Sequence, residues 1–197
     1  MNIILGSQSP RRRELLAGLD LSFDSVNIQA DESYPSSLQA GDIPIYIARA
    51  KALAYRDKLK EDDLLITADT IVWCDGQMMG KPVNDAEAKL MLRHLSGKTH
   101  QVYTAVCFAR KDYFDEFVDK TDVSFRLLTD DEIDYYVTTY KPFDKAGAYG
   151  IQEWIGFIGV TAINGSYFNV MGLPVEKVYD YLSRYPGIPA SWHPGKK

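Results

Sequence analysis

The sequence predicts a single α/β domain, and three observations lead to that class. Its 197 residues, of which 46% are hydrophobic and 25% charged, suffice for one globular unit with a substantial core. The chain opens with a short apolar strand that runs directly into a helix. Strand-like and helix-like segments then follow in mixed order, with no repeat or linker between them. We expect one domain over residues 1–185 and a mobile, proline-rich tail over 186–197.

The first strand and helix meet at a small turn. Residues 3–5 are apolar and β-prone, and the Ser9-Pro10 pair predicts a helix that begins at Pro10, with Ser9 as its N-cap. The free N–H groups of the first helical turn form an anion site, to which Ser7 and the arginines that follow add side-chain donors. This stretch is therefore interpreted as a phosphate cradle.

Arg11, Arg12 and Arg13 also allow a plainer interpretation, because a capped helix with a run of arginines is usually just a solvated face. However, three cations at a helix N-terminus oppose the helix dipole, and a bound anion would relieve that conflict. The motif is neither a P-loop nor a dinucleotide fingerprint, because the required lysine and glycines are absent. The residues alone leave both interpretations open.

A second strand and a second helix follow. Residues 21–29 alternate loosely and predict a strand, which ends next to the carboxylates of Asp31 and Glu32. Asp42 is expected to cap a helix over 44–58, whose alanines indicate close packing against a neighbour. Lys51 lies in that helix, and its plainer interpretation is a lysine that extends its ammonium group into water.

Residues 64–73 give the strongest strand signal in the chain and are apolar nearly throughout, as expected of a central strand covered on both faces. Asp69 lies in the middle of this strand. A carboxylate in such surroundings is costly unless it is paired, hydrogen-bonded or metal-bound, so a functional role is favoured. The alternative is a carboxylate that accepts backbone N–H bonds at a β-bulge.

The remaining segments read as regular elements around two polar loops. Asp75-Gly76 predicts a hairpin that returns to Lys81, held between Gly80 and Pro82 near the Asp69 strand. Residues 144–152 are too rich in glycine and alanine for a regular element, and Lys145 and Gln152 near their ends favour a ligand-binding loop over a merely flexible one. The other expected elements follow in chain order. A helix capped by Asn84 and Glu87 stops at Gly97, and an antiparallel pair of strands covers 101–110 and 114–128. A helix opened by Thr129 and Glu132 ends before Pro142, a hairpin joins strands 155–163 and 167–170 across Asn164-Gly165, and a last helix begins at Leu173.

Composition excludes several classes of function. The net charge of −5 argues against nucleic-acid binding, and no run is long enough to span a membrane. Cys74 and Cys107 each lie in an apolar run and are expected to be buried free thiols, which points to the reducing cytoplasm. The three histidines are scattered without metal-ligand spacing, and no motif for a serine or cysteine nucleophile is present.

What recurs instead is cations and carboxylates on loops next to strands. The cations Arg11 to Arg13, Lys51, Lys81 and Lys145 suit phosphate binding, and the carboxylates Asp31, Glu32 and Asp69 suit a divalent metal or deprotonation of a water. Phosphoryl chemistry fits this mixture, because it depends mainly on positioning and charge neutralisation.

Seven motifs in one order together resemble the Maf family of nucleoside triphosphate pyrophosphatases. They extend from residue 3 to about residue 182 and comprise Ser7-x-Ser9-Pro10-Arg11-Arg12, Asp31-Glu32, Ala48-Arg49-Ala50-Lys51-Ala52, Ala68-Asp69-Thr70, Gly80-Lys81-Pro82, the run 144–152, and Ser166-Tyr167-x-Asn169-Val170-x-Gly172-Leu173-Pro174. The resemblance implies an α/β fold with a mixed, curved sheet, and two lobes with a cleft between them. It also implies hydrolysis of a nucleoside triphosphate to the monophosphate and pyrophosphate with a divalent metal, Mg²⁺ or Mn²⁺, in an enzyme that often forms a homodimer.

The resemblance also assigns roles to individual residues. Asp69 matches the proton acceptor for the attacking water, and Glu32 matches a metal-linked carboxylate, so these two are the expected metal-associated groups. The phosphate-binding and catalytic-support positions are matched by Ser7, Arg11, Lys51, Lys81 and Lys145. The positions of the pyrimidine subgroup, which acts on dTTP and UTP, are matched by Arg12, Thr70 and Gln152. The arginines therefore divide, and Arg13 is expected to lie on the surface.

The chain departs from the family pattern at two places. Gly6 replaces a commoner alanine, which is expected to loosen only the strand end, and Glu153-Trp154 follows Gln152 where a glycine is usual, which would reshape the base pocket. The alternatives are the subgroup that acts on 7-methyl-GTP and a nucleotide-binding regulator of cell division with little catalysis. Intact Asp69, Glu32 and Lys81 argue against the regulator.

Overall fold

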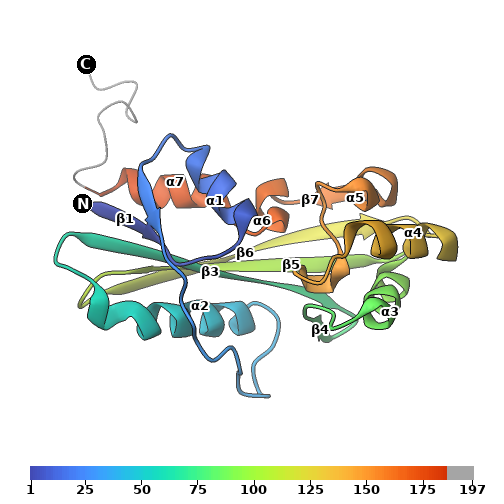
Figure 1. The fold of residues 1–197 in the computed structure, drawn as a ribbon, viewed down its shortest axis with the longest axis horizontal. Coiled ribbons are helices and arrows are strands. Elements are labelled where there is room, and N and C mark those ends of the chain that lie inside the picture. The colour runs from blue at the N-terminus through green and yellow to red at the C-terminus, as the bar shows by residue number, and fades with distance from the viewer. Residues whose placement is uncertain (186–197) are drawn as a thin grey trace.

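A seven-stranded sheet forms the centre of the computed structural model, which describes residues 1–185 (Figure 1). The tail expected over 186–197 lies outside these residues. The strands run in the order β2-β1-β3-β5-β6-β7, and β4 pairs with β3 beside this path. Because β1 is parallel to β2 and β3 while the other pairs are antiparallel, the sheet is mixed, as expected. The strands are β1 (Asn2–Leu5), β2 (Phe23–Ser25), β3 (Asp63–Cys74), β4 (Gln77–Met79), β5 (Thr99–Ala109), β6 (Phe114–Phe125) and β7 (Val160–Asn164).

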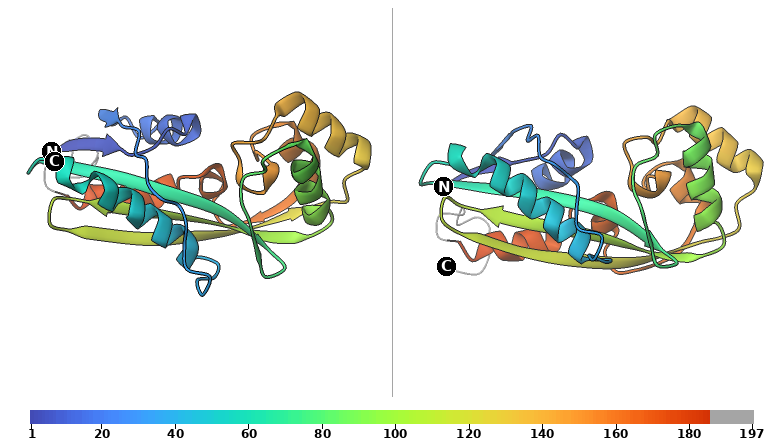
Figure 2. Two further views of the ribbon diagram at one scale, coloured as in Figure 1. Left: turned by 60° about the horizontal axis from the view of Figure 1, so that its bottom comes forward. Right: turned by 90° about the horizontal axis from the view of Figure 1, so that it is seen from below.

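Helices gather at the two ends of the sheet and form two lobes (Figure 2). The first lobe carries α1, α2 and α7, and the second carries α3, α4 and α5 (Figures 1 and 2). The helices are α1 (Pro10–Ala17), α2 (Asp42–Tyr55), α3 (Asp85–Leu95), α4 (Asp130–Tyr140), α5 (Trp154–Gly159), α6 (Tyr167–Met171) and α7 (Val175–Ser183), with short 3₁₀ turns η1 (Arg56–Lys58) and η2 (Ala146–Ala148).

Three long strands connect the lobes. β3, β5 and β6 run through both, and each supplies side chains to a separate core at either end. On β3, for example, Ile66 packs in the core of the first lobe and Val72 in the core of the second. The two lobes that the resemblance implies are therefore present, and they are built on one continuous sheet.

One edge of β3 is interrupted. Residues 63–66 pair with β1 and residues 72–74 pair with β4, but no strand within residues 1–185 pairs with 67–71 on that edge. On the other edge the pairing with β5 is continuous, and Asp69 stands opposite Ala105. The strand thus stays rigid at the point where one of its edges is open, and Asp69 lies there.

Several helix starts follow the expected capping chemistry. Ser9 Oγ accepts the Arg12 N–H at the start of α1, and Asn84 Oδ1 accepts the Glu87 N–H at the start of α3. Thr129 and Glu132 form the predicted capping box of α4, which ends at Tyr140. The helix expected to begin after an Asp42 cap instead includes Asp42, with Gly41 at the cap position, and it ends at Tyr55. The strand expected over 21–29 is shorter and covers only Phe23–Ser25.

The hairpin expected from strands 155–163 and 167–170 is wrong. Residues 154–159 form α5, and only residues 160–164 are a strand, which pairs with β6. Gly165 does turn the chain, with φ +129°, but Ser166 then caps α6 by accepting the Asn169 N–H at 3.3 Å. A serine placed to satisfy a free helical N–H group here favours a helix over a returning strand.

Candidate active site

Two adjoining hollows lie beside the open edge of β3. The first is lined by Asp69, Thr70, Lys145 and Gln152 over an apolar floor, and the second is lined by Ser7 and Glu32. Side chains from both lobes border the two hollows together, namely Ser9, Arg11, Arg12, Lys51, Lys81 and Asp144. All ten residues that the sequence predicts for the site therefore line one continuous cleft, although they come from six separate segments of the chain.

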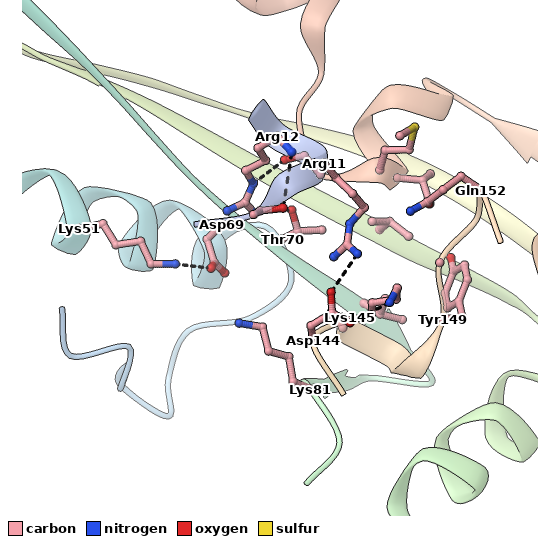
Figure 3. Close-up of a pocket in the computed structure, with 18 residues that line it drawn as sticks. Arg11, Arg12, Lys51, Asp69, Thr70, Lys81, Asp144, Lys145, Tyr149 and Gln152 are labelled. Atoms are coloured by element: carbon pink, nitrogen blue, oxygen red, sulfur yellow. Dashed lines mark hydrogen bonds and ion pairs between the residues drawn. The ribbon is translucent and has the colours of Figure 1, made fainter. Parts of the chain in front are cut away.

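Asp69 is paired with Lys51, and Figure 3 shows the two side chains pointing toward each other from β3 and α2. Lys51 Nζ lies 2.8 Å from Asp69 Oδ1 and 2.9 Å from Glu32 Oε1. The Thr67 hydroxyl donates to the Ala48 carbonyl at 2.7 Å, which fixes α2 against β3 one turn before Lys51. The interpretation of Lys51 as a lysine with a solvated head is wrong, and so is a bulge at Asp69, because the register with β5 is regular there.

The charges around Glu32 favour its ionised form. Partial burial alone would raise the pKa of this carboxyl, but the hydrogen bond and charge of Lys51, with the charges of Lys81 and Arg12, lower it below its usual value. Glu32 Oε2 and Asp69 Oδ2 accept no hydrogen bond from the described residues. Each carboxylate therefore has one oxygen tied to Lys51 and one free oxygen.

Arg12 fills the gap in the edge of β3. Its guanidinium donates to the Ala68 carbonyl at 2.8 Å, to the Gly172 carbonyl at 2.8 Å and to the Thr70 hydroxyl at 2.9 Å. The Thr70 hydroxyl also lies 2.9 Å from that of Thr104 on β5. Burial lowers the pKa of Arg12, against the opposing charge of Asp69. Arg12 thus supplies the donors that a neighbouring strand would otherwise give, and it fixes Thr70.

The start of α1 presents the other predicted donors. Ser7 is nearly buried, and its hydroxyl accepts the Ser9 N–H at 3.2 Å. Arg11 reaches across the cleft and donates to Asp144 at 3.0 Å (Figure 3), whereas Arg13 is exposed, as expected. Gly6 is more than a loose strand end, because a Cβ there would lie 2.9 Å from Thr67 Cγ2 and 2.5 Å from Ile28 Cδ1.

Lys145 is buried and lies between two carboxylates. Its ammonium is 2.7 Å from Asp144 Oδ1 and 3.1 Å from Glu153 Oε1. Burial acts to raise the pKa of Asp144, but Lys145 and Arg11 together lower it below its usual value. Lys81 and Gln152 differ from Lys145, because neither side chain hydrogen-bonds to another described residue. Both are thus free to contact a ligand.

The structure adds residues that the sequence did not single out. Asp144 bridges Arg11 and Lys145, and Tyr149 lines the first hollow with its hydroxyl 2.7 Å from His100 Nε2. An apolar floor is formed by Val72, Val102, Val170 and Met171. The position of Asp144 next to Lys145 is a signal that could have identified it, whereas the apolar lining has the same sequence signature as any core strand and gives no signal.

The two carboxylates fit a hard cation in part. Glu32 and Asp69 offer oxygen ligands of the kind that Mg²⁺ and Mn²⁺ prefer, and both lie within 3 Å of one ammonium group. Across residues 1–185, three potential ligands close enough to share an ion occur elsewhere, in the group Cys74, Asp75 and His94. There the Lys98 ammonium is already 2.6 Å from Asp75, and burial with the Asp75 charge raises the pKa of the Cys74 thiol, which disfavours the thiolate that a metal requires.

The comparison with known proteins identifies the family. Residues 2–185 match the family described as Maf-like protein. The chain belongs to the Maf family. This Maf-like chain is 56% identical over 183 residues to the dTTP/UTP pyrophosphatase of Phocaeicola vulgatus, across 92% of this chain and 95% of that one. It is also 56% identical over 184 residues to the dTTP/UTP pyrophosphatase of Parabacteroides distasonis, across 93% and 95% of the two chains.

A solved structure of the Staphylococcus aureus Ham1 protein aligns with a TM-score of 0.47 and 12% identity, over 64% of this chain and 72% of that one, a likeness too weak to bear on function. Within residues 1–185 no helix is both long and apolar enough to span a bilayer. Cys74 and Cys107 are buried free thiols, as expected.

Proposed function

We propose that this protein hydrolyses dTTP and UTP to the corresponding monophosphates and pyrophosphate. The observation that carries the proposal is the pair of Asp69 and Lys51 at the open edge of β3, faced across the cleft by Lys81, Lys145 and Arg11. A carboxylate positioned by a lysine, next to cations without a structural role in the core, suits attack of water on a polyphosphate. The names of the close relatives agree with this reaction.

Asp69 is the proposed proton acceptor. Its Oδ1 is held by Lys51, which leaves Oδ2 free to take a proton from a water that attacks the α phosphorus. The bond from the α phosphorus to the bridging oxygen then breaks, and pyrophosphate leaves. Lys51 fixes the direction in which Asp69 points, because α2 is itself anchored to β3 through Thr67.

The cations neutralise the triphosphate. Ser7 and Arg11 lie at or just before the start of α1, and Lys81 and Lys145 come from the other lobe. Around the two hollows these four side chains offer hydrogen-bond donors for phosphate oxygens. Glu32 and Asp69 would hold a divalent cation, Mg²⁺ or Mn²⁺, which when bound supplies charge neutralisation at the phosphates. Glu32 fits this role because its ionised form is favoured and its Oε2 is free.

We propose that the base end of the substrate lies in the first hollow. Gln152 has an amide free to hydrogen-bond to a pyrimidine edge, and Thr70 is fixed by Arg12 and Thr104 at the same hollow. The apolar floor under them suits the face of a small aromatic ring. The relatives named dTTP/UTP pyrophosphatase support the pyrimidine choice over 7-methyl-GTP.

A panel of triphosphates tests the proposal. Purified protein is incubated with dTTP, UTP, CTP, GTP and 7-methyl-GTP, each with Mg²⁺, with Mn²⁺ and with a chelator, and the products are separated. We expect monophosphate and pyrophosphate from dTTP and UTP, and loss of turnover with the chelator. Orthophosphate with a diphosphate, or no turnover of any nucleotide, would refute the proposal.

We further propose a cytoplasmic protein that acts on free nucleotides and forms a homodimer. Light scattering of the purified protein tests the dimer independently of the activity.

A further inference from the structure

Glu153 lies outside the lining of both hollows but contacts a residue that lines the first one. Its Oε1 is 3.1 Å from Lys145 Nζ, and its Oε2 accepts a hydrogen bond from the Tyr136 hydroxyl. The Tyr136 hydroxyl in turn accepts the Gly150 N–H at 3.0 Å. One carboxylate thus joins the proposed phosphate-binding lysine to a buried side chain of α4 and to the loop at Gly150.

The two carboxylates on Lys145 are held very differently. The Asp144 side chain is 57% exposed and is shared with Arg11 at the mouth of the cleft. The Glu153 side chain is only 20% exposed and is braced by Tyr136, which is fully buried. A phosphate that enters the cleft can replace Asp144 on Lys145, whereas Glu153 is fixed in place.

The backbone packs tightly around this contact. A Cβ at Gly150 would lie 2.8 Å from Glu153 Cδ and 3.1 Å from Lys145 Cε, so any larger residue there would displace one or both of these side chains. Glu153 is also the N-cap residue of α5, and its carbonyl accepts the Gly156 N–H at 2.9 Å. The position of Glu153 is therefore set by its helix, its loop and Tyr136 together.

Charge alone would make Glu153 unfavourable in a site for an anion. A carboxylate next to Lys145 partly neutralises a cation that a triphosphate needs, so simple electrostatics predicts tighter substrate binding without it. A long flexible lysine, however, loses side-chain freedom when it binds phosphate, and a partner that already holds its ammonium reduces that loss.

We propose that Glu153 is a positioning residue, which holds the Lys145 ammonium in the cleft and couples it to the 145–150 loop through Tyr136. The proposal rests on the proposed function, because it assigns Lys145 to the triphosphate. It predicts that removal of the Glu153 charge weakens catalysis, in the opposite direction to the electrostatic expectation.

Glu153→Gln is the direct test. The amide oxygen can still accept the Tyr136 hydroxyl, but the side chain no longer offers a carboxylate to Lys145. We expect kcat/KM for dTTP and UTP to fall about tenfold, as for loss of an oriented binding group. In a Lys145→Met background the same substitution should change kcat/KM by less than about twofold, because its effect is transmitted through Lys145.

Each other outcome has a defined meaning. A rise in kcat/KM would mean that Glu153 only repels the substrate, and an equal fall in both backgrounds would mean a general structural role; either refutes the proposal. Glu176→Gln, on an exposed glutamate in the first turn of α7, is the matched control and should leave kcat/KM unchanged. If Glu153→Gln does not fold, Tyr136→Phe removes the brace instead, and its effect should likewise vanish in the Lys145→Met background.

A binding measurement separates this proposal from the proposed function. The affinity for a dTTP analogue with a non-hydrolysable α,β linkage is measured by calorimetry for wild type, both single variants and the double variant. If wild type turns over no triphosphate but Glu153 and Lys145 remain coupled in binding, the proposed reaction is wrong and the positioning role stands. If turnover occurs without coupling in either measurement, the positioning role is wrong.

Discussion

Asp69 is a carboxylate on a continuous strand, with one oxygen bound to Lys51 and the other free. Asp69→Asn keeps the shape of the side chain but removes its basicity. We expect kcat for dTTP to fall by about a thousandfold, the range for loss of a general base. The affinity for the dTTP analogue with a non-hydrolysable α,β linkage should change little, because the cationic side chains proposed to bind its phosphates remain. Steady-state kinetics and calorimetry on the same preparation check both.

The control for that prediction is Asp112→Asn, since the Asp112 side chain is 88% exposed and lies away from the cleft. Its kcat should equal that of wild type. If Asp69→Asn keeps more than about a tenth of the wild-type kcat, another group accepts the proton and the assignment of Asp69 is wrong.

Arg12 and Arg13 are neighbours with opposite surroundings. Arg12 is bound to two carbonyls and a hydroxyl, whereas Arg13 is exposed. A lysine cannot reproduce the planar fork of donors, so Arg12→Lys should leave buried carbonyls unpaired and lower the free energy of unfolding by about 2 kcal/mol. Because Thr70 also loses one of its two partners and keeps only Thr104, the preference for dTTP over other triphosphates should weaken.

Arg13→Lys provides the comparison, with unfolding and substrate preference expected to match wild type. Urea unfolding and the triphosphate panel measure the two effects separately. A normal substrate preference in a destabilised Arg12→Lys protein would show that Arg12 supports the sheet edge without influencing the choice of base.

At the scale of elements, Gly156 lets α5 pack closely against the loop that precedes it. A Cβ at Gly156 would lie 1.9 Å from the Ile151 carbonyl oxygen, whereas one at Gly159 would lie 3.2 Å from Leu128 Cδ2, the end of a flexible side chain. Gly156→Ala should therefore lower the free energy of unfolding by about 3 kcal/mol, and Gly159→Ala much less. Since Ile151 precedes Gln152, Gly156→Ala should also raise KM. Chemical unfolding and kinetics of both variants check this, and equal destabilisation by the two would contradict it.

Elements with strong local signals could be predicted from the sequence. The Ser9 cap, the Asn84 cap and the Thr129 capping box each satisfy a free N–H group within a few residues, so their chemistry is local and readable. The long β3 signal placed Asp69 correctly on a central strand. The ten site residues were grouped by resemblance to the Maf family, since no local pattern reveals that Lys51 on α2 and Lys81 after β4 come to the same cleft beside β3.

Other features depend on contacts that no local pattern contains. Residues 155–163 are apolar enough for a strand, but tertiary packing makes their first part helical. The sequence favours a ligand-binding loop over 144–152, but it does not reveal that a Cβ at Gly147 would meet Val72 Cγ2 at 2.9 Å, so that this glycine lets the loop approach β3. Tyr136 lies on the buried face of α4, and only the structure reveals that its hydroxyl donates to Glu153.

At the scale of the whole molecule, His100 makes stability depend on pH. It is fully buried, and burial lowers its pKa to about 4. The unfolded chain therefore binds a proton near pH 6.5 that the folded protein excludes until about pH 4, and the stability present above pH 6.5 is lost as the pH falls between these values. The loss should approach about 3 kcal/mol from this residue.

Urea unfolding of wild type and His100→Gln across pH 4 to 7 measures this contribution. Carboxylates titrate in both proteins, so the difference between the two slopes isolates the histidine. In His100→Gln, the slope of the unfolding free energy against pH should be smaller by an amount that corresponds to about one proton. Parallel slopes would mean that His100 is protonated in the folded protein, with its charge satisfied near Tyr149.

The strands that run through both lobes also limit how the molecule can be divided. β3, β5 and β6 each give side chains to both cores, so neither end contains a complete sheet of its own. A gene fragment for one lobe would encode three half strands with open edges, which favour aggregation over folding. A chimaera of two related proteins should therefore take both lobes, and with them both sides of the cleft, from the same parent.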